Sequence, residues 1–170
     1  MKFKLLFFSF LVTSLLTAQN TENSHTDLEK IVESFRVAII DHSDFEKFSD
    51  LFLHDSITWA AIVTGNTKKM VLKQKPDFTF KASDYKSFFN TLKEGSEEKF
   101  YDVKIDVRNE FATISFDYSF NVNSKVQNWG TEYWSLILVN DTWKITSVTW
   151  SQNLEKIDAC PFKDENIFKL

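Results

Sequence analysis

Residues 111–121 read FATISFDYSFN, and this stretch decides the fold class. Apolar side chains at 112, 114, 116, 118 and 120 alternate with small or polar ones at 113, 115, 117 and 119. A period of two predicts a β-strand with one buried face. Residues 100–107, 129–139 and 142–151 are predicted to be further strands, with Asn140-Asp141 as a tight turn. The back half of the chain is therefore predicted to form a four-stranded antiparallel meander.

Upstream of this meander the apolar residues follow a helical period. Thr26 and Glu29 form a capping-box pattern that predicts a helix start, and this helix is expected to end near Asp41. Its apolar stripe consists of Leu28, Ile31, Val32, Phe35 and Ile39. Two shorter helices are predicted to begin at Ser43 and Ser83.

Between these helices, residues 57–64 are rich in β-branched and aromatic types and meet the turn signal Gly65-Asn66. Residues 70–75 are predicted to return as a second strand. The order of elements predicts an α+β domain: a strongly curved antiparallel sheet with about three helices from the N-terminal half packed on its concave face. The predicted organisation is a signal peptide at 1–18, a flexible segment at 19–25, this domain at 26–152 and a C-terminal extension at 153–170.

The last predicted strand changes its parity. Trp143 and Ile145 share one face in a regular strand, whereas Val148 and Trp150 share the other. Either a bulge lies near Thr146-Ser147, or both faces of the sheet are covered. Apolar residues also occupy both faces of 134–139. A second covered face predicts a homodimer.

The N-terminus has the pattern of a secretory signal peptide. Lys2 and Lys4 precede an apolar run at 5–16, and the chain turns polar after the small residue Ala18. This run is shorter than the ~20 residues that a membrane-spanning helix needs. We therefore expect an exported protein, periplasmic or secreted, with no stable membrane anchor after cleavage.

Composition excludes several classes of function. The net charge is −4 and the lysines are scattered, so the clustered cations of a nucleic-acid-binding surface are missing. The single cysteine, Cys160, leaves no internal disulfide. No metal-binding, dinucleotide-binding or nucleophile motif is present, and we predict no metal and no cofactor.

Three segments resemble the nuclear-transport-factor-2-like superfamily, which includes SnoaL-like domains. They are Asp44-Phe45-Glu46 leading into LFLHDSI at 51–57, WGTEYWSL at 129–136, and WKITSVTWS at 143–151. The resemblance covers about residues 26–152 and implies a cystatin-like cone that encloses a pocket. The late segment is most similar to exported bacterial members described as SnoaL-like or lumazine-binding-like.

This superfamily contains isomerases, dehydratases, cyclases, small-ligand binders and interaction modules, so the resemblance implies fold rather than activity. Ketosteroid-isomerase-like members use a carboxylate base, a tyrosine and a protonated acid. The resemblance aligns these positions with Ala60, with Phe35 or Arg36, and with Ser135. None of the three residue types is kept, which counts against that mechanism.

The candidate ligand-binding residues are amphipathic aromatics on the predicted sheet and one strand carboxylate. They are Trp59, Tyr118, Glu132, Trp134 and Trp150. If Glu132 points inward, burial raises its pKa and suits it to acid–base work; if it points outward, it is a solvated side chain. The other catalytic candidates are His54 and Asp117.

The leading hypothesis is an exported, non-catalytic domain that binds a small apolar or aromatic molecule. The alternatives are an isomerase-, dehydratase- or cyclase-type enzyme that uses a buried carboxylate, and a protein-interaction module.

Overall fold

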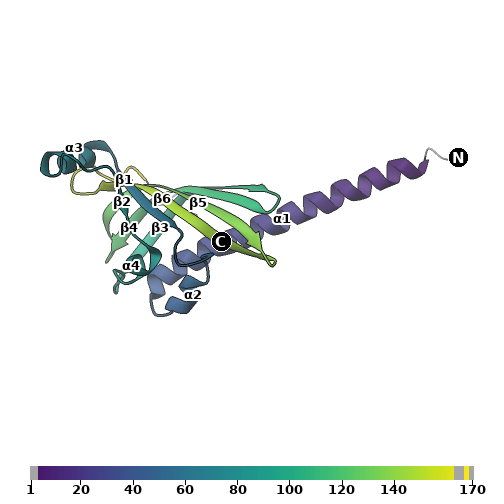
Figure 1. Ribbon diagram of the computed structural model, residues 1–170, viewed down its shortest axis with the longest axis horizontal. Helices are drawn as coiled ribbons and strands as arrows, with labels where there is room; N and C mark the ends of the chain where they lie inside the picture. The colour runs from purple at the N-terminus through teal and green to yellow at the C-terminus, as the bar shows by residue number, and fades with distance from the viewer. Residues whose placement is uncertain (1–3, 163–166, 169–170) are drawn as a thin grey trace.

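The computed structural model describes residues 4–162 and 167–168, with side chains from residue 23 onward. It contains four helices and six strands within these residues (Figure 1). In chain order they are α1 (Lys4–Asp41), α2 (Phe45–Ser49), β1 (Thr58–Val63), α3 (Gly65–Gln74), β2 (Lys81–Ala82), α4 (Tyr85–Phe89), β3 (Ser96–Arg108), β4 (Phe111–Val122), β5 (Lys125–Val139) and β6 (Thr142–Leu154).

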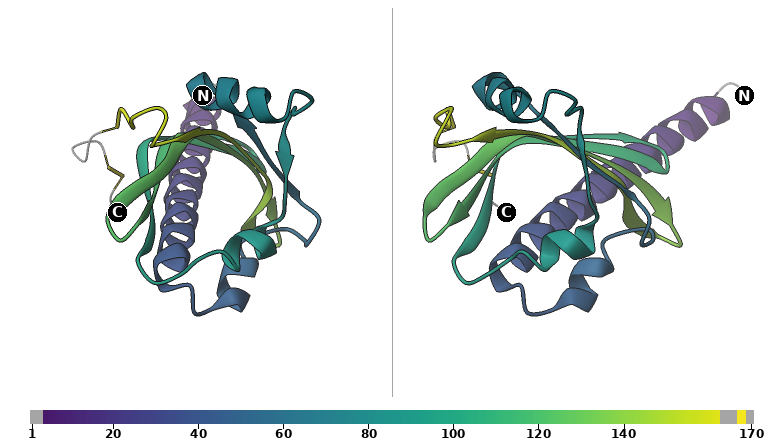
Figure 2. Two further views of the ribbon diagram at one scale, coloured as in Figure 1. Left: turned by 90° about the vertical axis from the view of Figure 1, so that its left-hand side faces the viewer. Right: turned by 60° about the vertical axis from the view of Figure 1, so that its left-hand side comes forward.

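The strands form one curved, open sheet in the order β2-β1-β6-β5-β4-β3. Helices α1, α2 and α4 lie on its concave side, as Figure 2 shows, whereas α3 lies outside at one end. The predicted α+β class and meander are therefore confirmed. One pairing differs from the all-antiparallel prediction, because β1 runs parallel to β6. A parallel neighbour requires a long crossover, and here the whole segment from β1 to β6 supplies it.

Helix α1 starts much earlier than the capping-box pattern predicted. It continues without a break through residues 19–25, which were expected to be flexible, so Thr26 lies inside the helix. Residues 4–41 contain neither proline nor glycine, and nothing in their sequence stops the helix. None of the helices in the described part of the chain is long and apolar enough to cross a membrane.

The predicted strand at 70–75 is wrong, because these residues belong to helix α3 and its C-cap. Gly65 enters the helix with a positive φ of 58°, which glycine adopts without strain. The carboxylate of Asp158 then accepts hydrogen bonds from the amides of Asn66 and Thr67, at 3.0 and 3.1 Å. The N-terminal cap of α3 is thus supplied from the far end of the chain.

Helix α4 is capped by Asp84 rather than by the predicted Ser83. The Asp84 carboxylate accepts from the amide of Ser87 at 2.7 Å, which satisfies one of the free amides of the first turn. Ser83 instead donates its own amide to the carbonyl of Trp59 at 3.0 Å.

Of the two explanations for the parity of the last strand, the structure shows the bulge. Ser135 pairs with Ser147, whereas its neighbour Leu136 pairs with Ile145, so Thr146 is an extra residue in β6. The bulge lets Ile145 and Val148 face the same buried side. It accounts for the parity of β6 without a second covered face.

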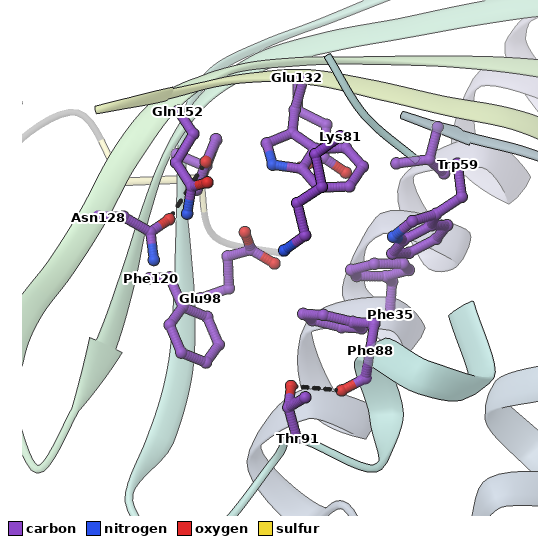
Figure 3. A pocket seen from close by; sticks show the side chains of 13 residues that line it. Phe35, Trp59, Lys81, Phe88, Thr91, Glu98, Phe120, Asn128, Glu132 and Gln152 are labelled. Carbon is purple, nitrogen blue, oxygen red and sulfur yellow. Dashed lines mark hydrogen bonds between the residues drawn. The ribbon is translucent and has the colours of Figure 1, made fainter. Parts of the chain in front are cut away.

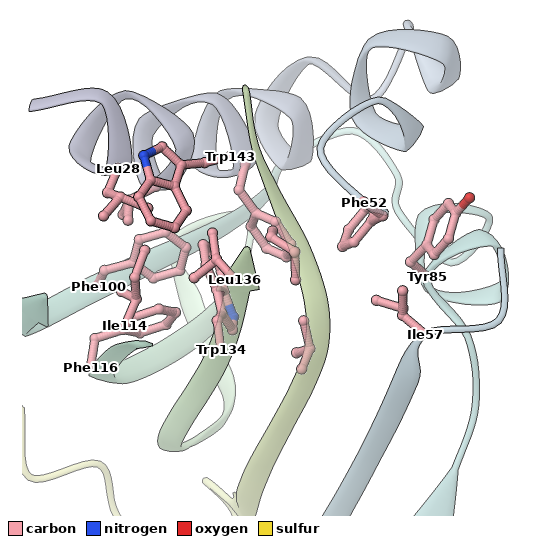
Figure 4. Close-up of a cluster of buried hydrophobic side chains, with 14 of the residues drawn as sticks. Leu28, Phe52, Ile57, Tyr85, Phe100, Ile114, Phe116, Trp134, Leu136 and Trp143 are labelled. Carbon is pink, nitrogen blue, oxygen red and sulfur yellow. The ribbon is translucent and has the colours of Figure 1, made fainter. Parts of the chain in front are cut away.

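Helix α1 is held against the sheet by an aromatic core (Figure 4). Phe35 lies at its centre, with its ring 4.7 Å from that of Trp134 on β5 and 5.3 Å from that of Phe48 on α2. Phe100 and Phe116 on neighbouring strands continue the cluster at 4.4 Å. This packing fills the part of the concave side that α1 covers.

The C-terminal extension covers the edge strand β3. Ile167 forms an antiparallel bridge with Tyr101, and the amide of Phe168 donates to the carbonyl of Phe100 at 2.8 Å. The ring of Phe162 lies 5.2 Å from that of Tyr101. An edge strand exposes unpaired backbone groups, so this segment protects it from pairing with another chain.

Candidate functional site

A cavity of about 170 Å³ opens in the part of the concave side that α1 leaves free (Figure 3). The strands supply most of its wall, and α1 and α4 each supply one aromatic ring. The apolar lining consists of Phe35, Trp59, Phe88, Phe120, Val148 and Trp150. The polar lining consists of Lys81, Thr91, Glu98, Tyr118, Asn128, Glu132 and Gln152.

Glu132 points into this cavity from β5, which settles the orientation that its sequence left open. It pairs across the sheet with Phe116 and Trp150, and only 5% of its surface is exposed. The indole Nε1 of Trp134 donates a 2.6 Å hydrogen bond to Oε1 of Glu132. Burial raises the pKa of Glu132 to about 7, and the hydrogen bond from Trp134 opposes the rise because it stabilises the charged form.

A second buried carboxyl, Glu98, lines the same cavity. It lies on β3 opposite Phe120, is 5% exposed, and has no hydrogen bond to its carboxyl group within the described residues. Burial raises the pKa of Glu98 well above its usual value, and the nearby charge of Glu132 raises it further. Since Glu132 has a hydrogen-bond donor and Glu98 has none, Glu132 ionises first and Glu98 keeps its proton.

Glu98 lies just before the strand that the sequence predicts, because the clear alternation starts only at residue 100. Strand β3 begins at Ser96, and Glu98 shares the face of Phe100. The alternation from 96 to 100 is the signal that could have revealed it. Lys81, Asn128 and Gln152 were also missed, because none of them stands out against the polar residues around it.

Tyr118 lies on β4, between the strands that carry the two glutamates. Its hydroxyl lies within hydrogen-bonding distance of Oδ1 of Asn128, at 3.2 Å, and of the carbonyl oxygen of Ser151, at 3.1 Å. Burial, followed by the charges of Glu98 and Glu132, raises the pKa of Tyr118 well above its usual value. The phenol therefore stays protonated and can donate a hydrogen bond.

The aromatic wall is formed by rings from β1, β6 and α4. The rings of Trp59 and Trp150 meet edge to face at 5.7 Å, and Phe88 lies 5.5 Å from Trp59. Trp134, also predicted to bind ligand, is buried behind the cavity and contacts it only through Glu132. Four of the five predicted ligand-binding residues thus line one space.

The remaining catalytic candidates lie elsewhere. His54 is exposed, and its Nδ1 accepts from the amide of Ser56 at 3.1 Å. Asp117 faces the outer side of the sheet and accepts a 2.6 Å hydrogen bond from the hydroxyl of Thr131. Neighbouring strand residues point to opposite faces, so Asp117 must face away from the cavity that Tyr118 lines. The structure does not bring either residue to the cavity.

Comparison with solved structures shows which fold this chain has. No protein-family model matches the sequence, and no curated protein matches it. Among solved structures, an NTF2-like protein with a cystatin-like fold from Novosphingobium aromaticivorans matches with a TM-score of 0.62 at 11% identity, over 88% of this chain and 92% of its own. An NTF2-like protein of unknown function from Shewanella baltica matches with a TM-score of 0.53 at 12% identity, over 78% of this chain and 95% of its own. This chain has the NTF2-like fold.

A proposed dehydratase of the NTF2-like family from Streptomyces avermitilis also matches, with a TM-score of 0.53 and 16% identity, over 79% of this chain and 99% of its own. At such identities the likeness shows the fold and carries no activity across. The chemistry of this NTF2-like cavity therefore depends on the residues that line it in this chain. Within the part of the chain that the structure describes, no group of three or more His, Cys, Asp or Glu side chains is arranged to hold a metal ion.

The cavity combines an apolar wall with a small set of polar groups that differ in charge. Glu132 can accept a proton near neutral pH, Glu98 can donate one, and Tyr118, Asn128 and Gln152 can form neutral hydrogen bonds. Pockets that orient a small molecule have this composition. The site can therefore bind a ring through its wall and fix the ring's polar substituent through the carboxyl groups.

Proposed function

We propose that this protein is an exported domain that binds a small, partly aromatic molecule in its cavity. The observation that carries the proposal is the meeting of Glu98, Glu132 and Tyr118 inside a wall of aromatic rings. The Glu98 carboxyl faces the cavity without a hydrogen bond from the described residues, so a ligand in the cavity can supply its partner. Binding without turnover is favoured because the isomerase positions hold Ala60, Phe35 or Arg36, and Ser135.

Tryptophan fluorescence tests this proposal, because Trp59 and Trp150 line the cavity. Single-ring aromatic molecules are titrated into the purified protein, and a saturable change in emission is expected. Trp150→Phe should lose most of this change. Trp129→Phe should keep it, since the Trp129 indole donates to the carbonyl of Asp158 outside the cavity. Emission that stays constant across the whole panel would remove the proposal's support.

A specific observation favours an acid–base enzyme as the second candidate. The pKa of Glu98 lies well above the usual value while that of Glu132 is about 7, so one carboxyl can act as an acid while the other acts as a base. In that case Glu132→Gln abolishes isomerisation or dehydration of a bound substrate, and it leaves the melting temperature nearly unchanged at about pH 5, where Glu132 is protonated. A variant that fails to fold would indicate a structural role for Glu132 instead.

Export rests on the charged and apolar pattern of residues 1–18. If the leader is cleaved after Ala18, the N-terminal sequence of the protein recovered outside the cytoplasm begins at Gln19. A product that retains Met1 in a membrane fraction would contradict this.

The outer face of the sheet supports the expected homodimer. Ile62, Phe80 and Tyr133 are 52%, 59% and 58% exposed, and they line one hollow of about 280 Å³ over β1, β5 and β6. Large apolar side chains that gather at one exposed place are typical of an interaction surface. A second copy of the same face would cover them in a two-fold symmetric contact.

A further inference from the structure

The Glu98 carboxyl is the feature of the cavity that the fold itself does not explain. It is 95% buried, it points into the cavity in Figure 3, and the described residues offer it no hydrogen bond. None of the side-chain oxygens or nitrogens in the described part of the chain is fully buried without a hydrogen-bond partner, so the Glu98 oxygens are open to the cavity rather than enclosed by the fold. Glutamine would fill the same space at a lower cost. A ligand that supplies a donor or a positive charge would explain its presence.

The rest of the lining is compatible with such a ligand. The rings of Trp59, Trp150 and Phe88 form an apolar wall against which the ring of a ligand can pack. The phenol of Tyr118 and the amide oxygens of Asn128 and Gln152 add neutral acceptors to the lining. The carboxyl groups therefore favour positive charge on the ligand, and the wall favours an apolar ring.

Lys81 is the one cationic side chain in the described lining. It lies on the short edge strand β2, is exposed, and reaches the mouth of the cavity with its ammonium pointing toward Glu98 (Figure 3). No ion pair joins Lys81 to Glu98 or Glu132 among the described residues. Lys81 therefore leaves Glu98 without an ion-pair partner among the described residues.

The size of the cavity restricts the ligand to a small molecule. A cavity of ~150 Å³ in another protein binds benzene. A cavity of about 170 Å³ therefore suits one six-membered ring with a short substituent.

We propose that the cavity selects a small ring-bearing amine, whose ammonium pairs with Glu98 in the field of Glu132 while its ring packs against Trp59, Phe88 and Trp150. This inference rests on the proposed binding function and adds the chemical class of the ligand. No covalent step is involved. The ammonium pairs with ionised Glu98, so its binding expels the proton that Glu98 holds in the free protein.

The experiment compares three probes of similar shape and different charge: benzylamine, benzyl alcohol and benzoate. Affinities are measured by calorimetry at about pH 8 in two buffers with different ionisation enthalpies. We expect benzylamine to bind at least about tenfold more tightly than benzyl alcohol, with a buffer-dependent heat that reports proton release. Its affinity should fall as the pH is lowered through about 7, because Glu132 is protonated there.

Variants separate the contributions of the charged groups. Glu98→Gln should lower the affinity for benzylamine at least about tenfold. The affinity of this variant for benzyl alcohol should stay within about threefold of the wild-type value. Glu132→Gln should have a smaller effect in the same direction. The Lys81→Met variant should bind benzylamine with unchanged or higher affinity, because the substitution removes a like charge. Asp117→Asn is the matched control: it removes a carboxyl from the opposite face of β4 and should change no affinity.

Three results would contradict the inference, and they differ in what they imply for the proposed binding function. If benzyl alcohol binds as tightly as benzylamine, the preference for an amine is wrong while the proposed binding function stands. If benzoate binds best and Lys81→Met abolishes its binding, the cavity selects an anion and the inference is overturned. If no single-ring probe binds, the proposed function fails together with the inference.

Discussion

Trp134 Nε1 donates a 2.6 Å hydrogen bond to Oε1 of Glu132, two residues earlier on the same strand. Both side chains face the concave side of β5, with Trp134 in the core and Glu132 at the cavity. The bond connects the core to the cavity and stabilises the ionised form of Glu132. It therefore determines which of the two buried carboxyls ionises first.

Trp134→Phe removes this donor while keeping an aromatic ring in the core. A hydrogen bond to a charged group contributes about 1.5–3 kcal/mol, so the pKa of Glu132 should rise by about one to two units above 7. The carbon chemical shift of the labelled Glu132 carboxyl, followed against pH, measures this. Trp143→Phe is the control, because Trp143 is also buried in the core but does not contact Glu132. Equal pKa values in the two variants would contradict the assignment.

The protein should lose stability as the pH rises from about 5 to about 8. Glu132 has a higher pKa in the folded state than in the unfolded state, so its contribution is fully present below about 4.5 and is lost as the pH passes 7. A shift from 4.5 to about 7 corresponds to about 3 kcal/mol. Glu98 adds to the same trend, because its pKa is also raised.

Urea denaturation at both pH values measures this loss, and Glu132→Gln should reduce it, with Glu98 accounting for the remainder. Asp55, Asp84 and Glu33 have lowered pKa values and act in the opposite direction, but only at more acidic pH. A wild-type protein equally stable at both pH values would show that the two carboxyls are not buried in solution.

Gly130→Ala should destabilise the fold strongly. A Cβ at this position would lie 2.0 Å from the carbonyl oxygen of Ser151 on β6, a backbone atom that cannot move without disturbing the strand pair. Overpacking of this kind costs about 1–3 kcal/mol or more. The same oxygen lies 3.1 Å from the Tyr118 hydroxyl, so the cavity should change as well. Thermal melting measures the effect, and Ser135→Ala, at an exposed position of the same strand, should melt within about 2 °C of wild type.

Tyr133→Lys should convert the expected dimer to a monomer without altering the cavity. Tyr133 is more than half exposed at the hollow on the outer face, and a lysine there places two like charges in a symmetric contact. Light scattering at several concentrations gives the mass, and benzylamine titration reports on the cavity. Tyr133→Phe should preserve the dimer. A wild-type protein that stays monomeric at every concentration would overturn the dimer proposal.

Much of this architecture follows from local patterns in the sequence. The alternation at 111–121 predicted β4, and the change of parity around Thr146 left a bulge in β6 as one of two possible explanations. Glu132 shares its parity with Trp134, so its inward orientation was one of two readings that the sequence allowed. These features are local because a strand places alternate residues on opposite faces wherever it lies.

Helix α3 shows where local patterns fail. Residues 70–75 resemble a strand in composition, but the cap that starts the helix is Asp158, more than ninety residues further along the chain. No window of sequence contains both partners.

The sequence by itself determined an α+β domain with an antiparallel meander, and it put Tyr118, Trp150 and Glu132 among the possible pocket residues. Only the tertiary structure decided that Glu98 shares a cavity with Glu132, that Trp134 stands behind it, and that His54 and Asp117 lie outside. The reason is physical: side-chain parity is set by each strand alone, whereas the meeting of two carboxyls depends on the register and curvature of three paired strands.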